Sequence, residues 1–354
     1  MKKALVFDPY LDTLGGGERY TLSFANTLDN LGYSVDLAWP DFTILKEAKA
    51  RFGLDFNKLK INPTAFKQFT HKTNLVRKLL FQRHYDIVFF LSDGSLPFLF
   101  GKRNFVHFQT PFVGRKLSFI DRMKIFLINK FIYNSKFTQK VNEKFLPSSK
   151  SVVLYPPVDT DSLKNTTPKE NIILSVGRFD SPSHAKRQDI LIEAYKKLSP
   201  LIRDKYTLIL AGALVTDQSY LDPYKKSAKD FNIKFVINPE FTKLKDLYCR
   251  AKIFWHASGY EIDEETYPDR VEHFGIVTVE AMASGCIPVV INKGGQREII
   301  SSKSGFLCED LNELVEKTSL LINSKSPAVF RQNAINRSNT FSTGNFITRL
   351  KEIL

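Results

Sequence analysis

The sequence predicts an α/β protein made of two doubly wound domains, each with a parallel sheet between layers of helices. Short apolar strands alternate with helical stretches along the chain, which is the pattern of parallel sheets. The polar stretch Asp159–Glu170 has no apolar period and interrupts this alternation, as a linker does. A length of 354 residues is sufficient for two separate hydrophobic cores.

The first half of the chain contains five expected strands and three expected helices. Gly32 ends the first helix, and Tyr155-Pro156-Pro157 stops the last strand. The expected strands are Lys3–Asp8, Ser34–Ala38, Asp86–Leu91, Asn104–His107 and Ser151–Leu154. The expected helices are Glu18–Leu31, His71–Arg83 and Ser118–Asn129.

The alternation restarts after the linker. The expected strands are Asn171–Val176, Thr207–Ala211, Lys234–Ile237, Ile253–His256 and Ile287–Ile291. The expected helices are Gln188–Leu198, Tyr220–Phe231, Val277–Ser284 and Asn345–Leu354. We therefore expect an N-terminal domain over 1–165, a C-terminal domain over 166–342, and a closing helix over 343–354 that packs back toward the N-terminal domain.

Composition and the absence of export signals favour the cytoplasm. The three cysteines, Cys249, Cys286 and Cys308, form no disulfide framework and no C-x-x-C pattern. The N-terminal apolar run stops at Asp8 and Pro9, too early for the core of a signal peptide. No stretch approaches the ~20 apolar residues of a membrane-spanning helix.

The positive charge is concentrated in one segment. Residues 66–150 hold 16 Lys and Arg against 4 Asp and Glu, a net charge of +12 out of +14 for the chain, together with half of the 30 phenylalanines. Such a segment favours contact with anionic lipid headgroups or another polyanion, through residues such as Arg77, Lys78, Arg115, Lys116, Arg122 and Lys124. The alternatives are a solvated basic face over a phenylalanine core, and a nucleic-acid surface, for which no module signature is present.

The most informative stretch runs from Val271 to Ile300 and holds two carboxylates eight positions apart, Glu272 and Glu280. Between them, Phe274-Gly275-Ile276 opens a predicted helix, whose N-terminus offers free N–H groups and partial positive charge. Carboxylates that accept hydrogen bonds from sugar hydroxyls, beside a helix end that favours anions, suit a nucleotide-sugar diphosphate. After the following strand, Gly294-Gly295 could bind the sugar through backbone N–H groups or form a simple turn.

Three further groups follow predicted strands, where ligands of doubly wound sheets bind. Gly15-Gly16-Gly17 opens the first helix and allows close approach of a phosphate, although a plain turn is the alternative; it is neither a P-loop nor G-x-G-x-x-G. Arg178 and Lys186 could clamp a diphosphate, or belong to a solvated basic loop. His107 could serve an acceptor or a phosphate, or be a structural histidine.

No metal site is expected. The pair Asp159 and Asp161 lies at the start of the linker and is more typical of a cap or turn. The acidic run Tyr260–Glu272 is more typical of a surface loop, in which only Glu272 has a defined place.

Taken together, these motifs resemble the glycosyltransferases of the GT-B fold, specifically the retaining family 4. The resemblance covers essentially the whole chain, from GGGER through HFQTP, YPPVD and GRF…KRQD to EHFGIVTVEAMASG and GGQREI. It is nearest to the branch that adds mannose to lipid-linked oligosaccharides. It implies two Rossmann-like domains facing a cleft, with an N-terminal acceptor domain and a C-terminal nucleotide-sugar donor domain.

The resemblance also implies residue roles. Glu280 would hold the ribose hydroxyls, while Phe274, Gly275 and Ile276 form the donor-binding helix start. Arg178 and Lys186 would neutralise the diphosphate, and Glu272 would bind the donor sugar. Gly15, Gly16 and Gly17 would cradle the diphosphate, Gly294 and Gly295 would lie at the sugar, and His107 would lie on the acceptor side. Where the family usually has Lys-Gly, this chain has Lys186-Arg187 after a longer loop, so Arg178 is assigned with more weight than Lys186.

The expected function is therefore metal-independent transfer of a hexose, with mannose as a candidate, from a nucleoside-diphosphate sugar such as GDP-mannose to a lipid-linked or polysaccharide acceptor. No cofactor and no nucleic-acid partner is expected. The enzyme would be cytoplasmic and peripheral on the inner face of an anionic membrane, docked through residues 66–150. Alternatives are a nucleotide-sugar epimerase or hydrolase of the same fold, or a non-catalytic protein that binds nucleic acid or sugar nucleotides.

Overall fold

The computed structural model describes residues 1–53, 55–56, 58–71, 74–164, 167–179, 186–214, 217–324 and 326–354. The chain divides into two compact units, Met1–Pro157 with Arg349–Leu354, and Val158–Thr348. The first boundary thus lies at Pro157, directly after the Pro-Pro pair that stops the last strand of the first unit, and not at residue 165. The last residues of the chain group with the first unit.

The first unit contains a seven-stranded parallel sheet with the order β3-β2-β1-β4-β5-β6-β7. Strand β4 reads IVFFL and is buried throughout, as expected of a strand covered on both faces. The strands are β1 (Lys3–Phe7), β2 (Ser34–Ala38), β3 (Lys60–Ile61), β4 (Ile87–Leu91), β5 (Arg103–Phe108), β6 (Lys130–Tyr133) and β7 (Ser151–Val153). The helices are α1 (Gly16–Asn30), α2 (Ile44–Phe52), α3 (Pro63–Thr70), α4 (Leu75–Gln82), α5 (Phe119–Leu127) and α6 (Lys136–Asn142), with short 3₁₀ turns at Leu11–Thr13 and Ser148–Lys150.

Alternate residues of this sheet pack against helices on opposite faces. On one face, Phe24 of α1 stacks on Phe89, with ring centroids 4.2 Å apart. On the other face, Phe69 of α3 stacks on Phe7 at 4.4 Å. The core is therefore aromatic on both sides of the sheet, which accounts for much of the phenylalanine content of the basic segment.

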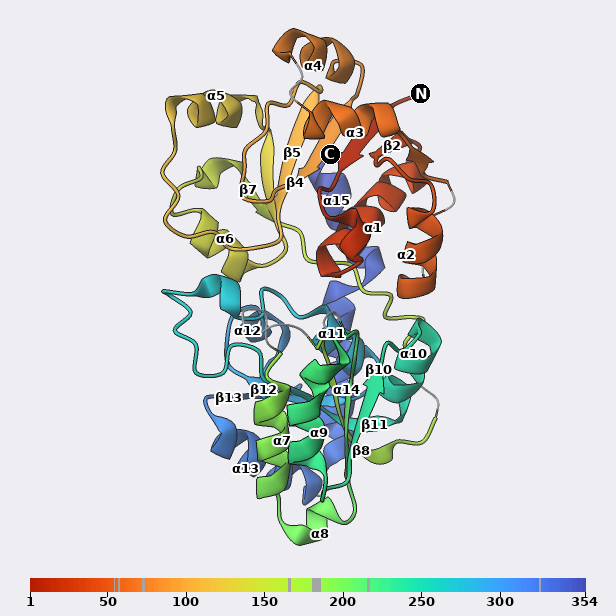
Figure 1. The fold of residues 1–354 in the computed structure, drawn as a ribbon, viewed down its shortest axis with the longest axis vertical. Helices are drawn as coiled ribbons and strands as arrows, with labels where there is room; N and C mark the ends of the chain where they lie inside the picture. The colour runs from red at the N-terminus through yellow and green to blue at the C-terminus, as the bar shows by residue number, and fades with distance from the viewer. Residues whose placement is uncertain are drawn as a thin grey trace. The chain divides into compact units, whose positions relative to one another are not determined.

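The second unit contains a six-stranded parallel sheet with the order β10-β9-β8-β11-β12-β13. Helices α7 and α13 contact one another on one face, with α9 beside α7, and α10, α11 and α14 lie on the other face (Figure 1). The strands are β8 (Glu170–Val176), β9 (Thr207–Gly212), β10 (Ile233–Ile237), β11 (Ala251–His256), β12 (Ile287–Ile291) and β13 (Phe306–Cys308). The helices are α7 (Gln188–Lys197), α8 (Pro200–Arg203), α9 (Asp222–Ala228), α10 (Phe241–Arg250), α11 (Ile276–Ala283), α12 (Gln296–Ile299), α13 (Leu311–Ile322) and α14 (Pro327–Ser338), with 3₁₀ turns at Gln218–Leu221, Pro268–Arg270 and Asn339–Phe341. Helix α15 (Thr343–Ile353) begins in this unit, and its last turn belongs to the residues that group with the first unit.

Both sheets confirm the doubly wound prediction, because each follows the Rossmann strand order with one reversal. The reversal lies between β1 and β4 in the first unit and between β8 and β11 in the second. Ligands of such sheets bind outside the carboxyl ends of the strands at this point. The residues that follow β1, β8 and β11 are therefore in the position where a ligand would bind.

One predicted helix is wrong in its bounds. The range His71–Arg83 holds only α4, and α3 ends at Thr70 with an extended His71 after it. The side chain of Asn74 accepts a hydrogen bond from the Val76 N–H and so starts α4 as a new helix. Lys72 and Thr73 lie outside the described residues. The short strands β3, β6 and β13 were not predicted. Neither were the helices α2, α3, α6, α8, α10, α12, α13 and α14.

Within the described ranges, no helix combines the length and the hydropathy required to cross a membrane.

Candidate functional site

The carboxylate of Glu272 is the centre of a charged cluster in the second unit. Its Oε2 accepts a hydrogen bond from Lys186 Nζ at 2.8 Å and another from His256 Nε2 at 2.9 Å. Burial by itself would raise the pKa of Glu272, but the charge of Lys186 and the bond from His256 hold that pKa well below its usual value. The carboxylate is therefore ionised at neutral pH.

Three neighbouring strands bring this cluster together. Gly177 and Arg178 follow β8, His256 ends β11, and the Gly294-Gly295 turn follows β12. Since β8, β11 and β12 are adjacent and parallel, these residues meet at one carboxyl edge of the sheet, beside the point where the strand order reverses. A side chain at Gly177 would collide with the aliphatic stem of Lys186, so glycine there gives Lys186 its place.

His256 belongs to the site but was not predicted. It is buried at the end of β11, and its Nδ1 lies 3.5 Å from the amide Nε2 of Gln296. Because an ionised carboxylate only accepts hydrogen bonds, Nε2 of His256 carries the proton that it donates to Glu272. The sequence pattern treated His256 only as the last residue of a strand, and nothing in its own neighbourhood distinguished it.

The Gly-Gly turn holds the backbone of Glu272. The Gly295 N–H donates to the Glu272 carbonyl at 2.8 Å, and a side chain at Gly294 or Gly295 would overlap the backbone of residues 272–274. The Gly294 N–H donates to Glu264 Oε2 at 2.9 Å. Both N–H groups thus have protein acceptors, and the assignment of Gly294 and Gly295 to sugar binding stays a prediction.

The acidic run Tyr260–Glu272 was predicted to be a surface loop in which only Glu272 has a defined place. This prediction is wrong for Glu264, which also has a fixed position. Its carboxylate bonds the Gly294 N–H and forms an ion pair with Arg297. This side chain is 16% exposed, so the loop is fastened to the Gly-Gly turn. By contrast, Asp159 accepts a hydrogen bond from the Ser162 N–H, as expected of a turn residue.

Helix α11 begins directly beside Glu272. Gly275 caps it at a φ of +113°, a conformation that glycine adopts readily, and a side chain there would meet Gln296 Nε2 at 2.7 Å. Phe274 is buried and Ile276 is the first helical residue, so the N–H groups of the first turn lie where the sequence placed them. This helix end adds partial positive charge next to the Lys186 ammonium group.

Glu280, the second carboxylate of the spaced pair, lies about one helical turn from that end. It is buried in α11, and the hydroxyl of Tyr248 donates to its Oε2 at 3.0 Å. The Tyr248 hydrogen bond fixes the rotamer of this carboxylate. The structure does not bring Glu280 into a hydrogen bond with Glu272 or Lys186 that would make one cluster of all three.

The two predicted cations differ in their surroundings. Lys186 is paired with Glu272, while Arg178 is exposed and its guanidinium makes no hydrogen bond to the described residues. The neighbouring Arg187 is committed elsewhere, because it binds Asp189 and the Tyr260 carbonyl and lies over the Tyr260 ring. Residues 180–185, the longer loop between Arg178 and Lys186, lie outside the described residues.

In the first unit, the glycine turn and the His107 strand lie together. Gly15 caps α1, and its N–H donates to the Glu18 carboxylate. A side chain at Gly17 would touch Gln109, which contacts the His107 ring at 3.0 Å. Gly15, Gly16 and Gly17 therefore open the helix as predicted.

His107 is fully buried in the first unit. Its Nδ1 lies 3.1 Å from the Ile132 carbonyl, its Nε2 contacts Gln109, and its ring stacks on Tyr20 at 3.9 Å. Burial lowers the pKa of His107 to about 4, against the opposing effect of the two hydrogen bonds, so the ring is neutral. Both nitrogens have partners, which is the structural alternative foreseen for a lone histidine; its role on the acceptor side stays a prediction.

Asp8, directly after β1, is a second residue that the sequence did not identify. Its Oδ1 accepts from the Tyr10 N–H at 2.9 Å, while Oδ2 is buried without a hydrogen-bond partner in the described part of the chain. Burial, together with the charge of Glu18, raises the pKa of Asp8 to about 7. A carboxyl group that titrates near neutrality therefore lies behind the glycine turn.

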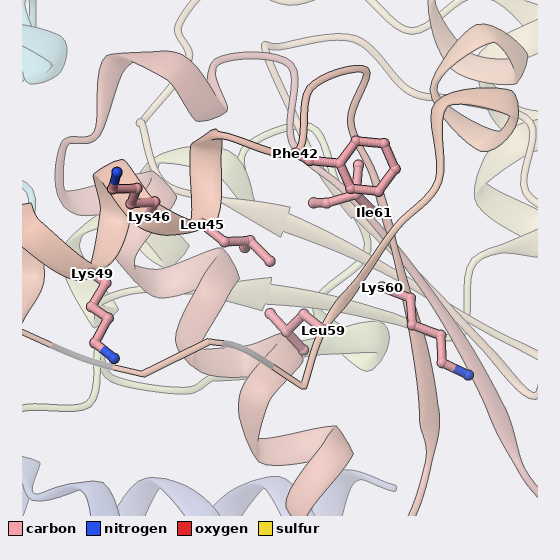
Figure 2. A pocket seen from close by; sticks show the side chains of 7 residues that line it. All are labelled: Phe42, Leu45, Lys46, Lys49, Leu59, Lys60 and Ile61. Carbon is pink, nitrogen blue, oxygen red and sulfur yellow. The ribbon is translucent and has the colours of Figure 1, made fainter.

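A shallow depression elsewhere on the first unit does not share this chemistry. It lies beside β3 and is lined by Phe42, Leu45, Lys46, Lys49, Leu59, Lys60 and Ile61. Figure 2 shows the three lysine ammonium groups pointing in different directions rather than toward one point. It contains none of the residues predicted from the sequence, and it lacks the convergent polar groups of a small-molecule site.

Two Rossmann-like units, with a charged cluster at the carboxyl edge of the sheet in the second, are characteristic of the GT-B class. A family model described as "Glycosyl transferases group 1" matches residues 159–337, and one described as "Glycosyltransferase Family 4" matches residues 14–162. The chain belongs to the glycosyl transferases group 1, with a family 4 domain at its N-terminal side. The resemblance seen in the sequence is confirmed.

Curated relatives are similar at low identity. A GDP-Man:Man(3)GlcNAc(2)-PP-Dol alpha-1,2-mannosyltransferase of Dictyostelium discoideum is 26% identical over 212 residues, which cover 55% of this chain and 40% of the relative. The human alpha-1,3/1,6-mannosyltransferase ALG2 is 24% identical over 266 residues, covering 68% of this chain and 59% of the relative. The chain thus spans less than two thirds of the length of these relatives.

Solved structures share the fold over the whole chain. The structure of HepE from Anabaena in complex with UDP superposes with a TM-score of 0.73 at 18% identity, covering 100% of this chain and 99% of that one. A glycosyltransferase structure from Rickettsia africae gives a TM-score of 0.76 at 18% identity, covering 99% and 97%. At this identity the likeness establishes the GT-B fold, as predicted.

The Gly-Gly turn provides a test of packing at the site. Replacing Gly295→Ala inserts a methyl group into the backbone of residues 273–274 and should lower the free energy of unfolding by about 1–3 kcal/mol. The matched control is Gly344→Ala in the same unit, where the nearest atom to a new methyl group is 3.9 Å away. Urea unfolding checks both variants, and equal stability of the two would contradict the packing described here.

Asp8 provides a test of the buried carboxyl group. A pKa of about 7 in the folded protein against 3.8 in the unfolded chain means that the folded state binds the proton more tightly. The proton bound by Asp8 stabilises the folded protein fully below pH 4. This stabilisation falls between about pH 4 and pH 7 and is lost above pH 7, a total change of up to about 4 kcal/mol. Asp8→Asn should therefore flatten the fall in melting temperature between pH 5 and pH 8, whereas Glu47→Gln, at an exposed carboxylate of α2, should not. An unchanged pH profile for Asp8→Asn would refute the assignment.

Proposed function

We propose that this chain transfers a hexose, with mannose as the first candidate, from a nucleoside-diphosphate sugar to a lipid-linked or polysaccharide acceptor, with retention of the anomeric configuration. The observation that carries the proposal is the cluster of Lys186, Glu272 and His256 beside the start of α11. It lies in the unit that the group 1 model matches, at the sheet edge where nucleotides bind. The names of the curated relatives make mannose the first candidate for the transferred sugar, and the name of the Dictyostelium relative makes GDP the first candidate for the nucleotide.

Glu272 is suited to hold the sugar. Both side-chain hydrogen bonds that it accepts from described residues end on Oε2, so that among those residues Oε1 stays available for the hydroxyl donors of a hexose. His256 and Lys186 keep the carboxylate ionised and fix its direction, so a hydroxyl would meet a preorganised acceptor. Glu280, held by Tyr248, is proposed to accept the ribose hydroxyls.

The reaction needs stabilisation of a leaving diphosphate. The bond between the anomeric carbon and the diphosphate oxygen breaks, negative charge grows on the diphosphate, and positive charge grows on the sugar ring. Arg178, which is free of protein partners in the described residues, Lys186 and the start of α11 would meet the growing negative charge. We propose that these fixed charges act without a metal ion.

Retention is proposed to follow a front-face path. The acceptor oxygen bonds to the anomeric carbon on the face from which the diphosphate departs, and the acceptor proton passes to the leaving phosphate oxygen. This path requires no protein nucleophile. The roles assigned to Gly15–Gly17, to His107 and to a peripheral membrane position on the cytoplasmic side stay predictions that accompany the proposal.

Donor binding is the first test. In a thermal-shift panel of GDP-, UDP- and ADP-sugars, one nucleotide should raise the melting temperature of the wild type, and EDTA should leave that shift unchanged. Glu280→Ala should lose the shift because the ribose acceptor is gone, while Lys205→Ala, at an exposed lysine, should keep it. A shift in Glu280→Ala equal to that of the wild type would refute the ribose assignment, and a shift abolished by EDTA would refute metal independence.

Turnover is the second test. Arg178→Ala should lower kcat by about 10²–10³-fold with the identified donor, because a charge aimed at the transition state is lost. The Lys205→Ala variant should turn over normally. Full activity of Arg178→Ala would contradict the proposed role. Sugar release without an acceptor would indicate a hydrolase, donor binding without any turnover would indicate a sensor, and salt-sensitive RNA binding without donor binding would indicate a nucleic-acid protein.

A further inference from the structure

Exposed apolar side chains are concentrated in one region of the first unit. Sixteen large apolar side chains are exposed in the described part of the chain, and nine of them lie between residues 75 and 126. These nine are Leu75, Val76, Leu79, Leu80, Val113, Phe119, Ile120, Met123 and Phe126. Eight of the nine belong to α4 and α5. Single exposed apolar residues are ordinary on a protein surface, but a contiguous set marks an interaction surface.

Helix α5 has the form of an interfacial helix. At 100° per residue, Phe119, Ile120, Met123 and Phe126 share one face, and none of the nine residues of the helix is buried. Phe126 is 83% exposed and Phe119 is 78% exposed. Arg122 and Lys124 lie at the two borders of this face, as basic residues do on helices that lie in a membrane interface.

Helix α4 repeats the pattern. Its exposed residues Leu75, Val76, Leu79 and Leu80 fall on one face, with Arg77 and Lys78 on the other side. Phe81 packs against the core from the opposite face, so the helix is anchored to the unit while its apolar face is uncovered. Two helices of one unit therefore present apolar faces that no described residue buries.

Helix α5 is held in place by hydrogen bonds at both of its ends, although its apolar face is uncovered. At its start, Ser118 and Asp121 form a capping box. At its end, Lys150 Nζ donates to the carbonyls of Ile125 at 2.8 Å and Ile128 at 2.6 Å, and Asn104 Nδ2 donates to the Leu127 carbonyl at 2.9 Å. A helix held at both ends by polar bonds presents its apolar face in a fixed direction, which is preorganisation for a partner.

The two helices lie at the same end of the first unit, and charges on them interact. Burial lowers the pKa of Lys78, and the charge of Lys124 lowers it further, so the two ammonium groups lie within electrostatic reach. Figure 1 shows α4 and α5 at the same end of the first unit. Each helix leads directly into a strand, β4 and β6, so both end at the amino edge of the sheet, away from the carboxyl edge that holds the glycine turn.

Two basic residues of the docking set predicted from the sequence, Arg115 and Lys124, have partners within the protein. Arg115 donates to the Gly94 carbonyl and lies 3.8 Å from the Asp121 carboxylate, so it holds the loop before α5. Lys124 pairs with the same carboxylate at 3.6 Å. The exposed cations that remain around the apolar faces are Arg77, Lys116 and Arg122, with Lys78 partly buried.

We propose that α4 and α5 insert their apolar side chains into the boundary between headgroups and acyl chains of a membrane that contains anionic lipid. The proposal deepens the proposed function, on which it rests for the choice of a membrane as partner, since a lipid-linked acceptor resides there. A second copy of the chain fits less well, because a two-fold contact would bring like basic borders together. An anionic headgroup layer complements both the charge and the apolar face.

Vesicle binding tests the proposal. The probe is a vesicle of equal parts phosphatidylcholine and phosphatidylglycerol, and the variant is Phe119→Ser/Phe126→Ser, which changes only exposed side chains and should melt like the wild type. The partition coefficient of the variant should fall at least about tenfold, because each phenylalanine contributes apolar area on insertion. The control Phe42→Ser/Leu201→Ser removes two exposed apolar residues outside the surface and should bind like the wild type.

Salt separates insertion from purely electrostatic docking. High salt should weaken the binding of the wild type but leave a residual part that Phe119→Ser/Phe126→Ser lacks. In a Met123→Trp variant, the vesicles should shift the indole emission to shorter wavelength, whereas Phe42→Trp should show no shift. Complete loss of wild-type binding in high salt, or equal binding of the two double variants, would overturn the proposal.

Two further measurements distinguish membrane docking from dimer formation and from the proposed glycosyltransferase function. A dimer in sedimentation equilibrium that the Phe119→Ser/Phe126→Ser variant converts to monomer, without vesicle binding, would assign the surface to a second copy. The donor thermal shift should be unchanged in Phe119→Ser/Phe126→Ser. A normal donor shift without vesicle binding by the wild type would overturn the docking inference alone, and vesicle binding without any donor shift would overturn the proposed function alone.

Discussion

The ionised carboxylate of Glu272 is the constraint around which the second unit is arranged. A largely buried carboxylate is stable only with partners, and here Lys186 and His256 both bond the same oxygen. The remaining features follow from placing that group. Gly294 and Gly295 let a second turn pass tightly behind its backbone, Gly275 turns the chain into α11, and Gln296 orients His256. One charge thus explains why glycines and a buried histidine surround it.

The sequence allowed the fold, and the place of several candidate site residues within it, to be predicted, because both depend on local patterns. Apolar strands followed by glycine turns place Glu272, Gly275 and Gly15–Gly17 with little ambiguity. Contacts between distant segments could not be predicted in this way. His256 joins the site only because β11 lies between β8 and β12, and Asp8 becomes unusual only through burial beside Glu18. Lys186, which the sequence assigned with less weight than Arg178, is the cation that the structure brings to Glu272.

The basic segment illustrates a second limit of sequence patterns. Its phenylalanines look uniform along the chain, but the fold divides them into two populations. Phe89, Phe105 and Phe108 fill the core, whereas Phe119 and Phe126 are exposed on a helix that polar bonds hold in place. Charge counting suggested contact with an anionic surface, and only the burial of each ring shows that the contact can also be hydrophobic. Arg115 shows the converse, since a basic residue counted with the surface is part of the scaffold.

The central claim is that the Glu272 cluster binds the sugar of the donor. Its most direct measurement is nitrogen NMR of the imidazole of His256, assigned with a His256→Gln variant, while nucleoside diphosphate and then nucleotide sugar are added. The account predicts that the nucleotide sugar changes the Nε2 resonance in a saturable manner, that the nucleoside diphosphate alone changes it less, and that Glu272→Gln removes the difference. Saturable binding of the nucleotide sugar with the His256 resonances unchanged would contradict the account.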